Sequence, residues 1–311
     1  THSLLLVFTR VGKVYPLEVY RVPELGRNAK GRPIINLVAI PKDEQIAAVV
    51  SVPELEQDDE EEVMSLLLVS RQGLVKRTPL SAYKNLRKGG MIACGVADGD
   101  ELVVVRKLHS LDGDVMLMSE KGKCIRFDLE QTPTFGRSAR GNRGIALAET
   151  DRVVDALVVP PSFIADDDPE TEDEELEGSD LEEGEDEAVE EEWETTLLTV
   201  TQLGFGKRTP FERYRRQGRY GKGIISTKIS GVTGDVVGAL EVSRDDQMML
   251  VTDTGRVIRI AAASVRLVKS RASKGVRLMR LEKDERIVDM ARIEDSEDPS
   301  EDAEGAEASE E

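Results

Sequence analysis

Five glycine-containing loops with clustered arginine and lysine residues are the parts of this 311-residue sequence whose chemistry is most readily inferred. The densest, residues 213–223, reads RYRRQGRYGKG and carries five basic side chains. Guanidinium and ammonium groups bind phosphate oxygens, and glycine lets backbone N–H groups approach the same oxygens closely. We therefore predict a phosphate-binding surface made by Arg27, Lys30, Arg32, Arg87, Lys88, Arg137, Arg140, Arg143, Arg215, Arg216, Arg219, Lys222, Lys269, Arg271 and Lys274.

The net charge of −19 conceals this basic surface, because most carboxylates lie in three tracts. Residues 54–62, 166–194 and 294–311 hold 7, 19 and 10 acidic side chains. These 36 leave 25 acidic residues against 42 Lys and Arg, so the remaining body carries a charge near +17. Tracts this acidic cannot bury enough apolar surface to fold, and we expect them to be disordered. They are either solubilising spacers or competitors for the ligand of the basic surface.

The rest of the sequence offers no catalytic residues and no metal site. Its two histidines, His2 and His109, lie in unrelated contexts without a Ser, Cys or metal-binding constellation, and no GxxxxGK[ST] phosphate loop is present. Two cysteines without a disulfide or metal pattern are typical of a reducing cytoplasm. No apolar run reaches the ~18 residues of a membrane span. Because the chain begins at Thr1 without Met, we expect it to be part of a longer protein.

The elements that must position the basic loops recur five times. Each repeat begins with two apolar runs around a glycine turn, a pattern that predicts a β-hairpin, at residues 3–19, 65–80, 115–129, 196–211 and 248–260. A basic loop follows each hairpin, and after it come a third short apolar run and, beyond an acidic turn, a fourth. The third runs are residues 33–40, 91–97, 144–148, 223–229 and 275–281. The fourth runs are residues 46–52, 101–108, 152–159, 235–242 and 286–293. We predict four strands per repeat.

The repeat has a period of about fifty residues once two insertions are removed. The glycines of the hairpin turns, Gly12, Gly73, Gly122, Gly204 and Gly255, are 61, 49, 82 and 51 residues apart, and the two long intervals contain acidic tracts. A four-stranded unit of this length predicts an all-β, β-propeller-like fold of about five to six blades. Two stacked sandwiches are the alternative, which the near-identical VKRTPL and GKRTPF at equivalent positions disfavour.

The predicted boundaries follow from this period. We expect one domain over residues 1–293, with repeats near 3–63, 64–114, 115–195, 196–247 and 248–293. A disordered acidic insert covers residues 165–194, and a disordered acidic tail covers residues 294–311.

Radial repetition would place the five basic loops on equivalent parts of a rim. A continuous band of phosphate contacts on a curved surface suits duplex DNA, whose bending costs several kcal/mol that many contacts must offset. The loops contain no element suited to a major groove, and few aromatic residues accompany them, so we predict bending of duplex DNA instead of base reading or single-strand stacking. A propeller scaffold that binds acidic protein partners is the alternative from a different class.

Several stretches also resemble the C-terminal domain of the bacterial DNA gyrase A subunit. They are residues 12–38 (GKVYPLEVYRVPELGRNAKGRPIINLV), 43–50, 99–105 and 136–154 (GRSARGNRGIALAETDRVV). The resemblance implies a β-pinwheel, a propeller variant whose blades exchange strands and whose basic rim wraps DNA. It also implies that the acidic tail modulates wrapping.

The same resemblance implies a place in a larger enzyme. The domain would support ATP-dependent negative supercoiling by a bacterial, nucleoid-associated heterotetramer of two A and two B subunits, which uses ATP and magnesium outside this chain. The family has six blades, and the first carries a box of the form QRRGGKG, for which residues 215–223 are a degenerate match in a later blade. The related domain of topoisomerase IV has fewer blades and no box, and it remains an alternative.

Overall fold

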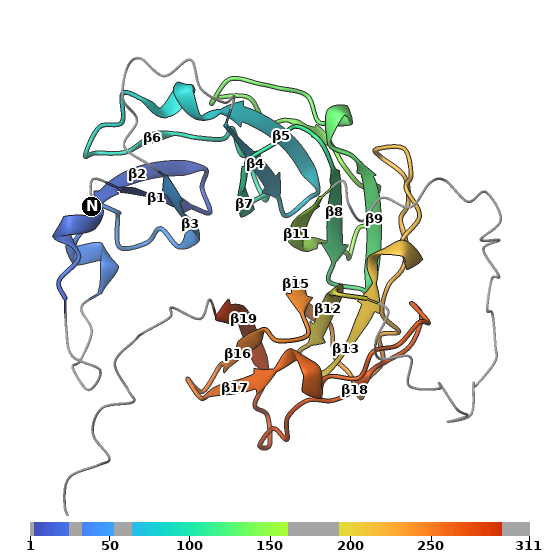
Figure 1. Ribbon diagram of the computed structural model, residues 1–311. Coiled ribbons are helices and arrows are strands. Elements are labelled where there is room, and N and C mark those ends of the chain that lie inside the picture. Colours follow the sequence, from blue (N-terminus) through green and yellow to red (C-terminus); the bar gives the residue numbers. More distant parts are fainter. Residues whose placement is uncertain (1–2, 25–32, 53–63, 161–192, 294–311) are drawn as a thin grey trace, which may run out of the picture.

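The computed structural model describes residues 3–24, 33–52, 64–160 and 193–293, which form five antiparallel sheets arranged around a ring (Figure 1). The predicted all-β propeller of radially repeated blades is confirmed, and the stacked-sandwich alternative is excluded. The acidic tracts at 54–62 and 294–311 lie outside the described residues, as does nearly all of the 165–194 insert.

Each sheet is ordered from an inner strand at the centre of the ring to an outer strand at its periphery (Figure 1). The first holds β3 (Ile46–Val52), β1 (Leu4–Thr9), β2 (Lys13–Glu18) and β6 (Met91–Ile92). The second holds β7 (Leu102–Leu108), β4 (Ser65–Ser70), β5 (Leu74–Pro79) and β10 (Asn142–Arg143). The third holds β11 (Val153–Val159), β8 (Asp114–Ser119), β9 (Lys123–Asp128) and β14 (Ile224–Ile225). The fourth holds β15 (Val236–Ser243), β12 (Thr195–Thr201), β13 (Phe205–Pro210) and β18 (Val276–Arg277). The fifth holds β19 (Ile287–Ile293), β16 (Gln247–Thr252) and β17 (Val257–Ala261).

Short 3₁₀ helices follow the hairpins and lead into the basic loops. They are η1 (Val19–Arg21), η3 (Leu80–Tyr83), η4 (Leu129–Gln131), η6 (Phe211–Arg213) and η7 (Ala262–Ser264), and a further one, η2 (Ile34–Asn36), lies in the first repeat.

The predicted hairpin turns are present in all five blades. In each, the glycine N–H donates to the carbonyl oxygen three residues earlier, as from Gly73 to Ser70 at 2.9 Å. The five turn glycines have φ between +79° and +82°, a left-handed backbone that other residues adopt only with strain. The glycine period of the sequence therefore reflects one turn geometry repeated around the ring.

The outer strand of each four-stranded blade comes from the following repeat. β6 pairs with β2, β10 with β5, β14 with β9, and β18 with β13. The third strand of a repeat therefore lies on the preceding blade, as the resemblance to a pinwheel implies. These exchanged strands are only two residues long, and in the third repeat the strand is Asn142–Arg143, immediately before the run predicted at 144–148.

Among the described residues the four-strand pattern is incomplete in two places: the first repeat forms three of its four predicted strands, and the fifth blade contains three strands. The third run of the first repeat, residues 33–40, has no preceding blade among the described residues. It forms η2 and packs Val38 and Ile40 against Tyr15 and Leu17 of its own blade. The fifth blade has three strands, because no later described repeat supplies an outer strand to β17. Pairing of the third run depends on a neighbouring blade and not on its own pattern.

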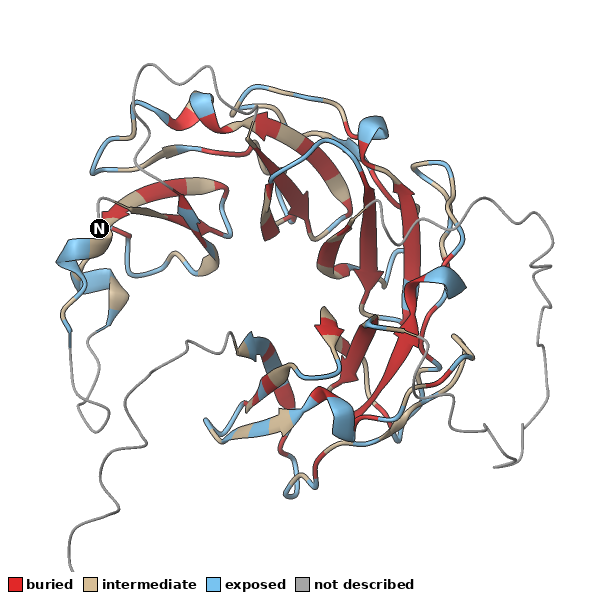
Figure 2. Cartoon of the chain, viewed as in Figure 1, coloured by how far each residue is buried: buried red, intermediate tan, exposed pale blue. Residues whose placement is uncertain are grey.

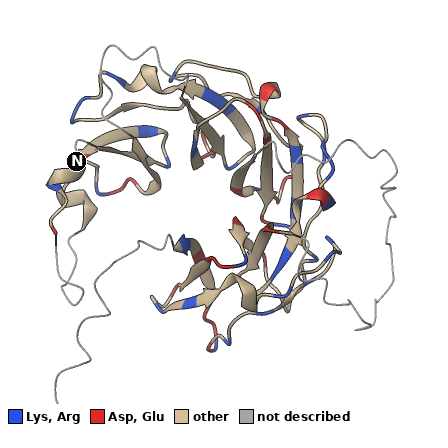
Figure 3. Ribbon diagram, viewed as in Figure 1, with Lys and Arg blue, Asp and Glu red and all other residues tan. Residues whose placement is uncertain are grey.

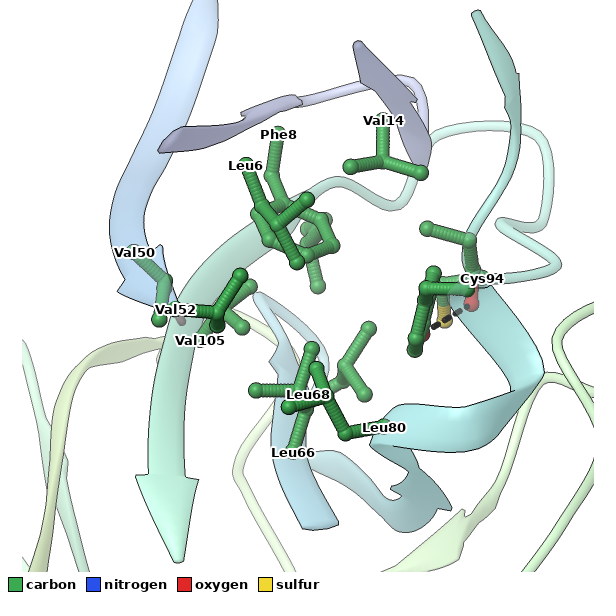
Figure 4. Packing of buried hydrophobic residues seen from close by; sticks show 13 residues of the cluster. Leu6, Phe8, Val14, Val50, Val52, Leu66, Leu68, Leu80, Cys94 and Val105 are labelled. Atoms are coloured by element: carbon green, nitrogen blue, oxygen red, sulfur yellow. Dashed lines mark hydrogen bonds between the residues drawn. The ribbon is translucent and has the colours of Figure 1, made fainter. Parts of the chain in front are cut away.

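Hydrophobic cores fill the junctions between successive blades. Figure 4 shows the first, in which Leu6 and Phe8 of β1 face Leu66 and Leu68 of β4. Three similar clusters join the remaining neighbours. Both faces of a middle blade are thus covered, which is why all six residues of β4 are buried, whereas β17 alternates between exposed and half-buried residues (Figure 2).

The inner strands contact one another in the order β3, β7, β11, β15 and β19 around the centre of the ring. A polar cavity of about 430 Å³ opens there, with Arg10, Arg71, Glu101, Glu120 and Arg152 in its lining. Arg71 and Glu101 approach to 2.9 Å, and Arg152 and Glu120 to 2.6 Å. None of the helices in the described part of the chain has the length and apolar character needed to cross a bilayer.

Candidate nucleic-acid interface

The described basic loops lie at the periphery of the ring, between a 3₁₀ helix and an exchanged outer strand (Figure 1). Lys and Arg residues recur along these outer strands and loops in Figure 3. We refer to residues 84–97, 132–148, 213–228 and 265–275 together as the basic rim. The loop of the first repeat, with Arg27, Lys30 and Arg32, lies outside the described residues.

Each rim loop from the third repeat onward is built against the blade that precedes it. The chain after the 3₁₀ helix makes a parallel bridge to an arginine of the preceding outer hairpin strand: Thr134 to Arg77, Arg216 to Arg126, and Leu267 to Arg208. The same arginines bind carbonyls of the incoming chain. Arg77 Nε donates to Thr132 O at 2.7 Å, and Arg208 Nε donates to Val265 O at 2.8 Å.

Arg126 makes the most extensive of these contacts. Its Nε donates to Asp114 at 2.6 Å, and its Nη1 donates to the carbonyls of Phe211 and Tyr214 at 2.9 and 3.2 Å. Asp114 is fully buried and Arg126 is 4 % exposed. Because the ion pair and the carbonyl contacts are out of water, this junction is fixed in geometry.

The rim loops are also hydrogen-bonded to one another. Gly95 N donates to Ala139 O at 3.1 Å, Tyr220 N to Gly144 O at 2.8 Å, and Lys228 N to Ser273 O at 3.2 Å. Arg143 Nη1 donates to the Tyr220 hydroxyl at 3.0 Å and lies 5.5 Å from the Tyr220 ring centroid. Loops from the second to the fifth repeat thus form one continuous band.

The structure describes twelve of the predicted side chains, and all lie on this band. Eight are exposed: Arg87, Lys88, Arg140, Arg143, Arg215, Lys222, Lys269 and Lys274. Four are half-buried: Arg137, Arg216, Arg219 and Arg271. The sequence-based selection therefore gathers side chains from four repeats on one part of the surface.

Three of the half-buried arginines are engaged within the protein, and one of them is Arg137, whose Nη1 donates to Met91 Sδ at 2.7 Å and to Ile92 O at 3.4 Å. Arg216 lies 2.8 Å from Asp114 and 3.6 Å from Asp128, so part of its charge is balanced at the blade junction. Arg219 Nη1 donates to Arg143 O at 2.6 Å and thereby ties the fourth loop to the third. Arg216 and Arg219 both belong to the degenerate box-like stretch, and both act at least in part as structural contacts.

Six of the rim glycines form two groups, only one of which fits the predicted approach to phosphate. At Gly89, Gly136 and Gly218 nothing lies within 4 Å of the position that a Cβ would take, so these glycines are open to a ligand. Gly141, Gly223 and Gly275 have positive φ, and a Cβ there would lie 2.4 to 2.7 Å from a carbonyl oxygen of the preceding blade. These three allow the loop to sit closely on its neighbour, and the sequence gives no sign of the difference.

Sequence reasoning also missed basic residues outside the loops. Lys123 is exposed on β9, where it pairs with Ile225 of β14, and Arg277 is exposed on β18, where it pairs with Phe205 of β13. Lys76 and Lys207 lie beneath the rim with fully buried side chains, and burial lowers the pKa of both. Their signal was the shared KRTP sequence, which indicates a repeated role that only the fold identifies.

One described contact concerns the acidic insert. Trp193, at the end of the 165–194 segment, has its ring centroid 5.5 Å from Lys269 Nζ of the fifth rim loop. The chain therefore leaves the insert beside a basic residue of the rim.

Comparison with known proteins agrees with this architecture. The family model of the DNA gyrase C-terminal domain, a β-propeller, matches residues 3–53, 65–108, 113–160, 195–243 and 246–294. The chain is 35% identical to the DNA gyrase A subunit of Salmonella typhimurium over 301 residues, covering 97% of this chain and 30% of that protein. For the Escherichia coli protein the identity is 35% over 293 residues, covering 94% of this chain and 29% of that protein. The chain thus spans under a third of the length of these relatives.

Solved structures share the fold at lower identity. The C-terminal domain of DNA topoisomerase IV superposes with a TM-score of 0.74 at 20% identity, covering 94% of this chain and 80% of that one. The DNA gyrase A C-terminal domain superposes with a TM-score of 0.70 at 22% identity, covering 94% and 83%. At these identities the structures establish only the fold, whereas the family match and the 35% identical relatives establish descent. The chain belongs to the family of DNA gyrase A C-terminal domains.

Proposed function

We propose that this domain binds duplex DNA along its basic rim and bends it around the ring, as the DNA-wrapping part of a gyrase A subunit. The observation that supports this most directly is the hydrogen-bonded continuity of four loops that carry exposed Arg and Lys at the periphery. Bending duplex DNA over a length well below its persistence length of about 150 bp requires phosphate contacts distributed along a curve.

The contribution of the domain to the whole enzyme is part of the same proposal. A gyrase built from two A and two B subunits would cleave DNA and hydrolyse ATP with magnesium elsewhere, in the bacterial cytoplasm. DNA bent in one sense by this domain would supply the crossing on which strand passage acts to introduce negative supercoils. The fifteen predicted phosphate contacts belong to this proposal, including those at Arg27, Lys30 and Arg32.

A ligation experiment tests the wrap. A nicked circular DNA is sealed with ligase in the presence of increasing protein, and the linking number is compared with that of a protein-free control. We expect a positive shift that grows with protein concentration. DNA binding without a shift would contradict wrapping and leave a domain that bends or recognises DNA crossings, and a lack of preference for long over short duplex would favour acidic protein partners.

A salt titration tests the rim itself. Arg140, Lys222 and Lys274 are exposed rim residues in three different loops. The slope of log K against log salt is negative, and replacing all three with Gln should make it less steep by about 2.7, or 0.9 per phosphate contact. The matched control replaces Arg10, Arg152 and Arg286 of the central cavity with Gln, which removes the same charge. Equal slopes for the two triple variants would exclude the rim as the DNA path.

The acidic insert and tail are proposed to compete with DNA for the rim. The nearness of Trp193 to Lys269 supports this for the insert. Deleting residues 166–192, or residues 294–311, should therefore tighten binding at low salt. Unchanged affinity for both deletions would assign them to a spacer role.

A further inference from the structure

Two lysines occupy the same position in the second and fourth blades, with their ammonium groups enclosed. Lys76 and Lys207 are three residues beyond the turn glycines of their hairpins, and both are 0% exposed. An ammonium group has three N–H donors, and burial requires each of them to find an acceptor.

The acceptors lie mainly in the rim loop of the following repeat. Lys76 Nζ donates to Gly136 O at 3.1 Å and Arg137 O at 2.8 Å, and also to Ala93 O at 2.9 Å. Lys207 Nζ donates to Ser270 O at 3.0 Å, to Arg271 O and to Ser273 Oγ at 3.1 Å. Each lysine thus binds the carbonyls of two successive loop residues. The second residue of each pair, Arg137 or Arg271, is a predicted phosphate contact.

The register of strand exchange brings a glycine over each lysine. Val75 pairs with Asn142, which places Gly141 opposite Lys76, and Gly206 pairs with Val276, which places Gly275 opposite Lys207. A Cβ on either glycine would lie 3.2 or 3.1 Å from the Cβ of the lysine beneath it. The loop can reach the ammonium group because this side of its backbone carries no side chain.

Blade formation itself does not require a lysine here. Tyr15, Ile125 and Ile258 occupy the equivalent position in the other three hairpins. Ile125 is fully buried and has Gly223 opposite it, so an apolar side chain fits the same junction. The sheet itself therefore does not require the lysine, which is found where the loops of the third and fifth repeats offer their carbonyls to it.

We propose, on the basis of the proposed DNA-binding function, that Lys76 and Lys207 are positioning residues that turn rim-loop carbonyls inward and so leave the loop's basic groups facing DNA. Carbonyl oxygens on the outer side would repel phosphate, whereas the enclosed ammonium group satisfies them from below. The loops concerned carry Arg137, Arg140 and Arg143 in one case and Lys269, Arg271 and Lys274 in the other.

The charge state of Lys207 makes this positioning testable without a mutation. Burial lowers the pKa of Lys207 to about 7, and the positive charge of Arg271, which faces it from the loop, acts in the same direction. Loss of the proton ends the cost of enclosing a charge, so opening of the loop, which returns Lys207 to water and to its ordinary pKa, should become less favourable as pH rises above about 7. The pKa of Lys76 is lowered by burial and by Arg137, with Cys94 acting in the opposite direction.

The experiment compares Lys207→Ile, which copies the residue of the third blade, with Lys228→Met. Lys228 is exposed in the neighbouring rim loop, so its replacement removes the same charge without releasing the carbonyls. We measure hydrogen exchange in peptides covering residues 265–275 and the salt dependence of duplex binding. For Lys207→Ile we expect about tenfold faster hydrogen exchange in the loop. The salt slope should be less steep by up to about 2.7, which corresponds to the loss of three phosphate contacts. For Lys228→Met we expect unchanged exchange and a slope less steep by at most about 0.9.

A pH series and a conservative variant separate positioning from general destabilisation. From about pH 6 to 8.5, exchange in the wild-type loop should accelerate less than its intrinsic pH dependence predicts, and Lys207→Ile should lack this shortfall. Lys207→Gln, which retains two N–H donors, should recover part of the DNA affinity. If Lys207→Ile does not fold, the wild-type pH series and Lys207→Gln still decide the matter.

The two proposals fail in different ways. Loop exchange that is unaltered in Lys207→Ile and that follows its intrinsic pH dependence in the wild type would overturn the positioning role while wild-type DNA binding persists. Absence of DNA binding by the wild type would overturn the proposed function, whatever the exchange data show.

Discussion

Strand exchange can be tested by adding one methyl group at each of two hairpin turns, only one of which is crossed by an exchanged segment. Gly122 and Gly255 have φ of +79° and +82°, so alanine imposes the same backbone strain, about 1–2 kcal/mol, at either turn. At Gly122 a Cβ would lie 2.3 Å from Thr227 O of the exchanged segment, whereas at Gly255 nothing lies within 4 Å.

The difference between the two variants follows from the contacts at Gly122. Its carbonyl accepts hydrogen bonds from Ser226 N at 2.8 Å and Thr227 N at 3.1 Å. A displaced segment weakens both, at about 0.5–1.5 kcal/mol each. Gly122→Ala should therefore cost about 1–3 kcal/mol more than Gly255→Ala, because only the former moves an exchanged strand.

Urea unfolding of the two variants measures the total cost, and hydrogen exchange at Ser226 and Thr227 reports the local opening. Exchange is the more direct readout, since a ring of five blades need not unfold in one step. Equal losses of stability, with unchanged protection at Ser226 and Thr227, would refute the crossing of the exchanged segment over this turn.

Three further predictions follow from buried groups. Arg126→Met should lower the free energy of unfolding by about 3–5 kcal/mol, because it removes the closest partner of the buried Asp114 carboxylate; a loss under about 1 kcal/mol in urea unfolding would contradict this. The stability of the wild type relative to Lys207→Ile should rise as pH increases from about 7 towards 10.5, because the unfolded lysine binds a proton that the folded one has lost, and the difference levels off above that range; a flat difference in unfolding free energy would show that Lys207 is not shifted. Cys94 and Cys124 should resist thiol reagents near neutral pH until denaturant is added, because burial raises the pKa of both thiols, that of Cys124 to about 12; rapid labelling of the native protein would argue against closed blade junctions.

Much of the fold could be predicted because it is encoded locally. The hairpins and the inner strands follow from apolar runs and turn glycines that recur at a constant spacing once the insertions are removed, and the runs predicted at 46–52 and 286–293 are strands to within one residue. The third run of each repeat does not show in its own pattern whether it will pair as a strand, or with which blade. PIINLVAI is as apolar as any of these runs, yet it forms η2 because no described blade precedes it.

The basic composition of the rim could be predicted from the sequence, but the contacts of each basic side chain could not. Arg and Lys beside glycine mark the loops, but Arg216 and Arg219 have the same sequence environment as Arg215 and differ in their partners across a blade junction. Lys76 and Lys207 read as further surface charge in a KRTP strand, and only strand exchange explains why they are enclosed. Contacts between repeats lie beyond what a pattern within one repeat can specify.

Exchange of outer strands also determines the order in which the molecule can be completed during synthesis. β2 ends at Glu18, but its partner β6 begins at Met91, after the whole second hairpin has been made. A blade on a nascent chain therefore waits with an open edge until the next repeat leaves the ribosome. Assembly proceeds one repeat behind translation, and a stop codon within any later repeat damages the blade before it as well as its own.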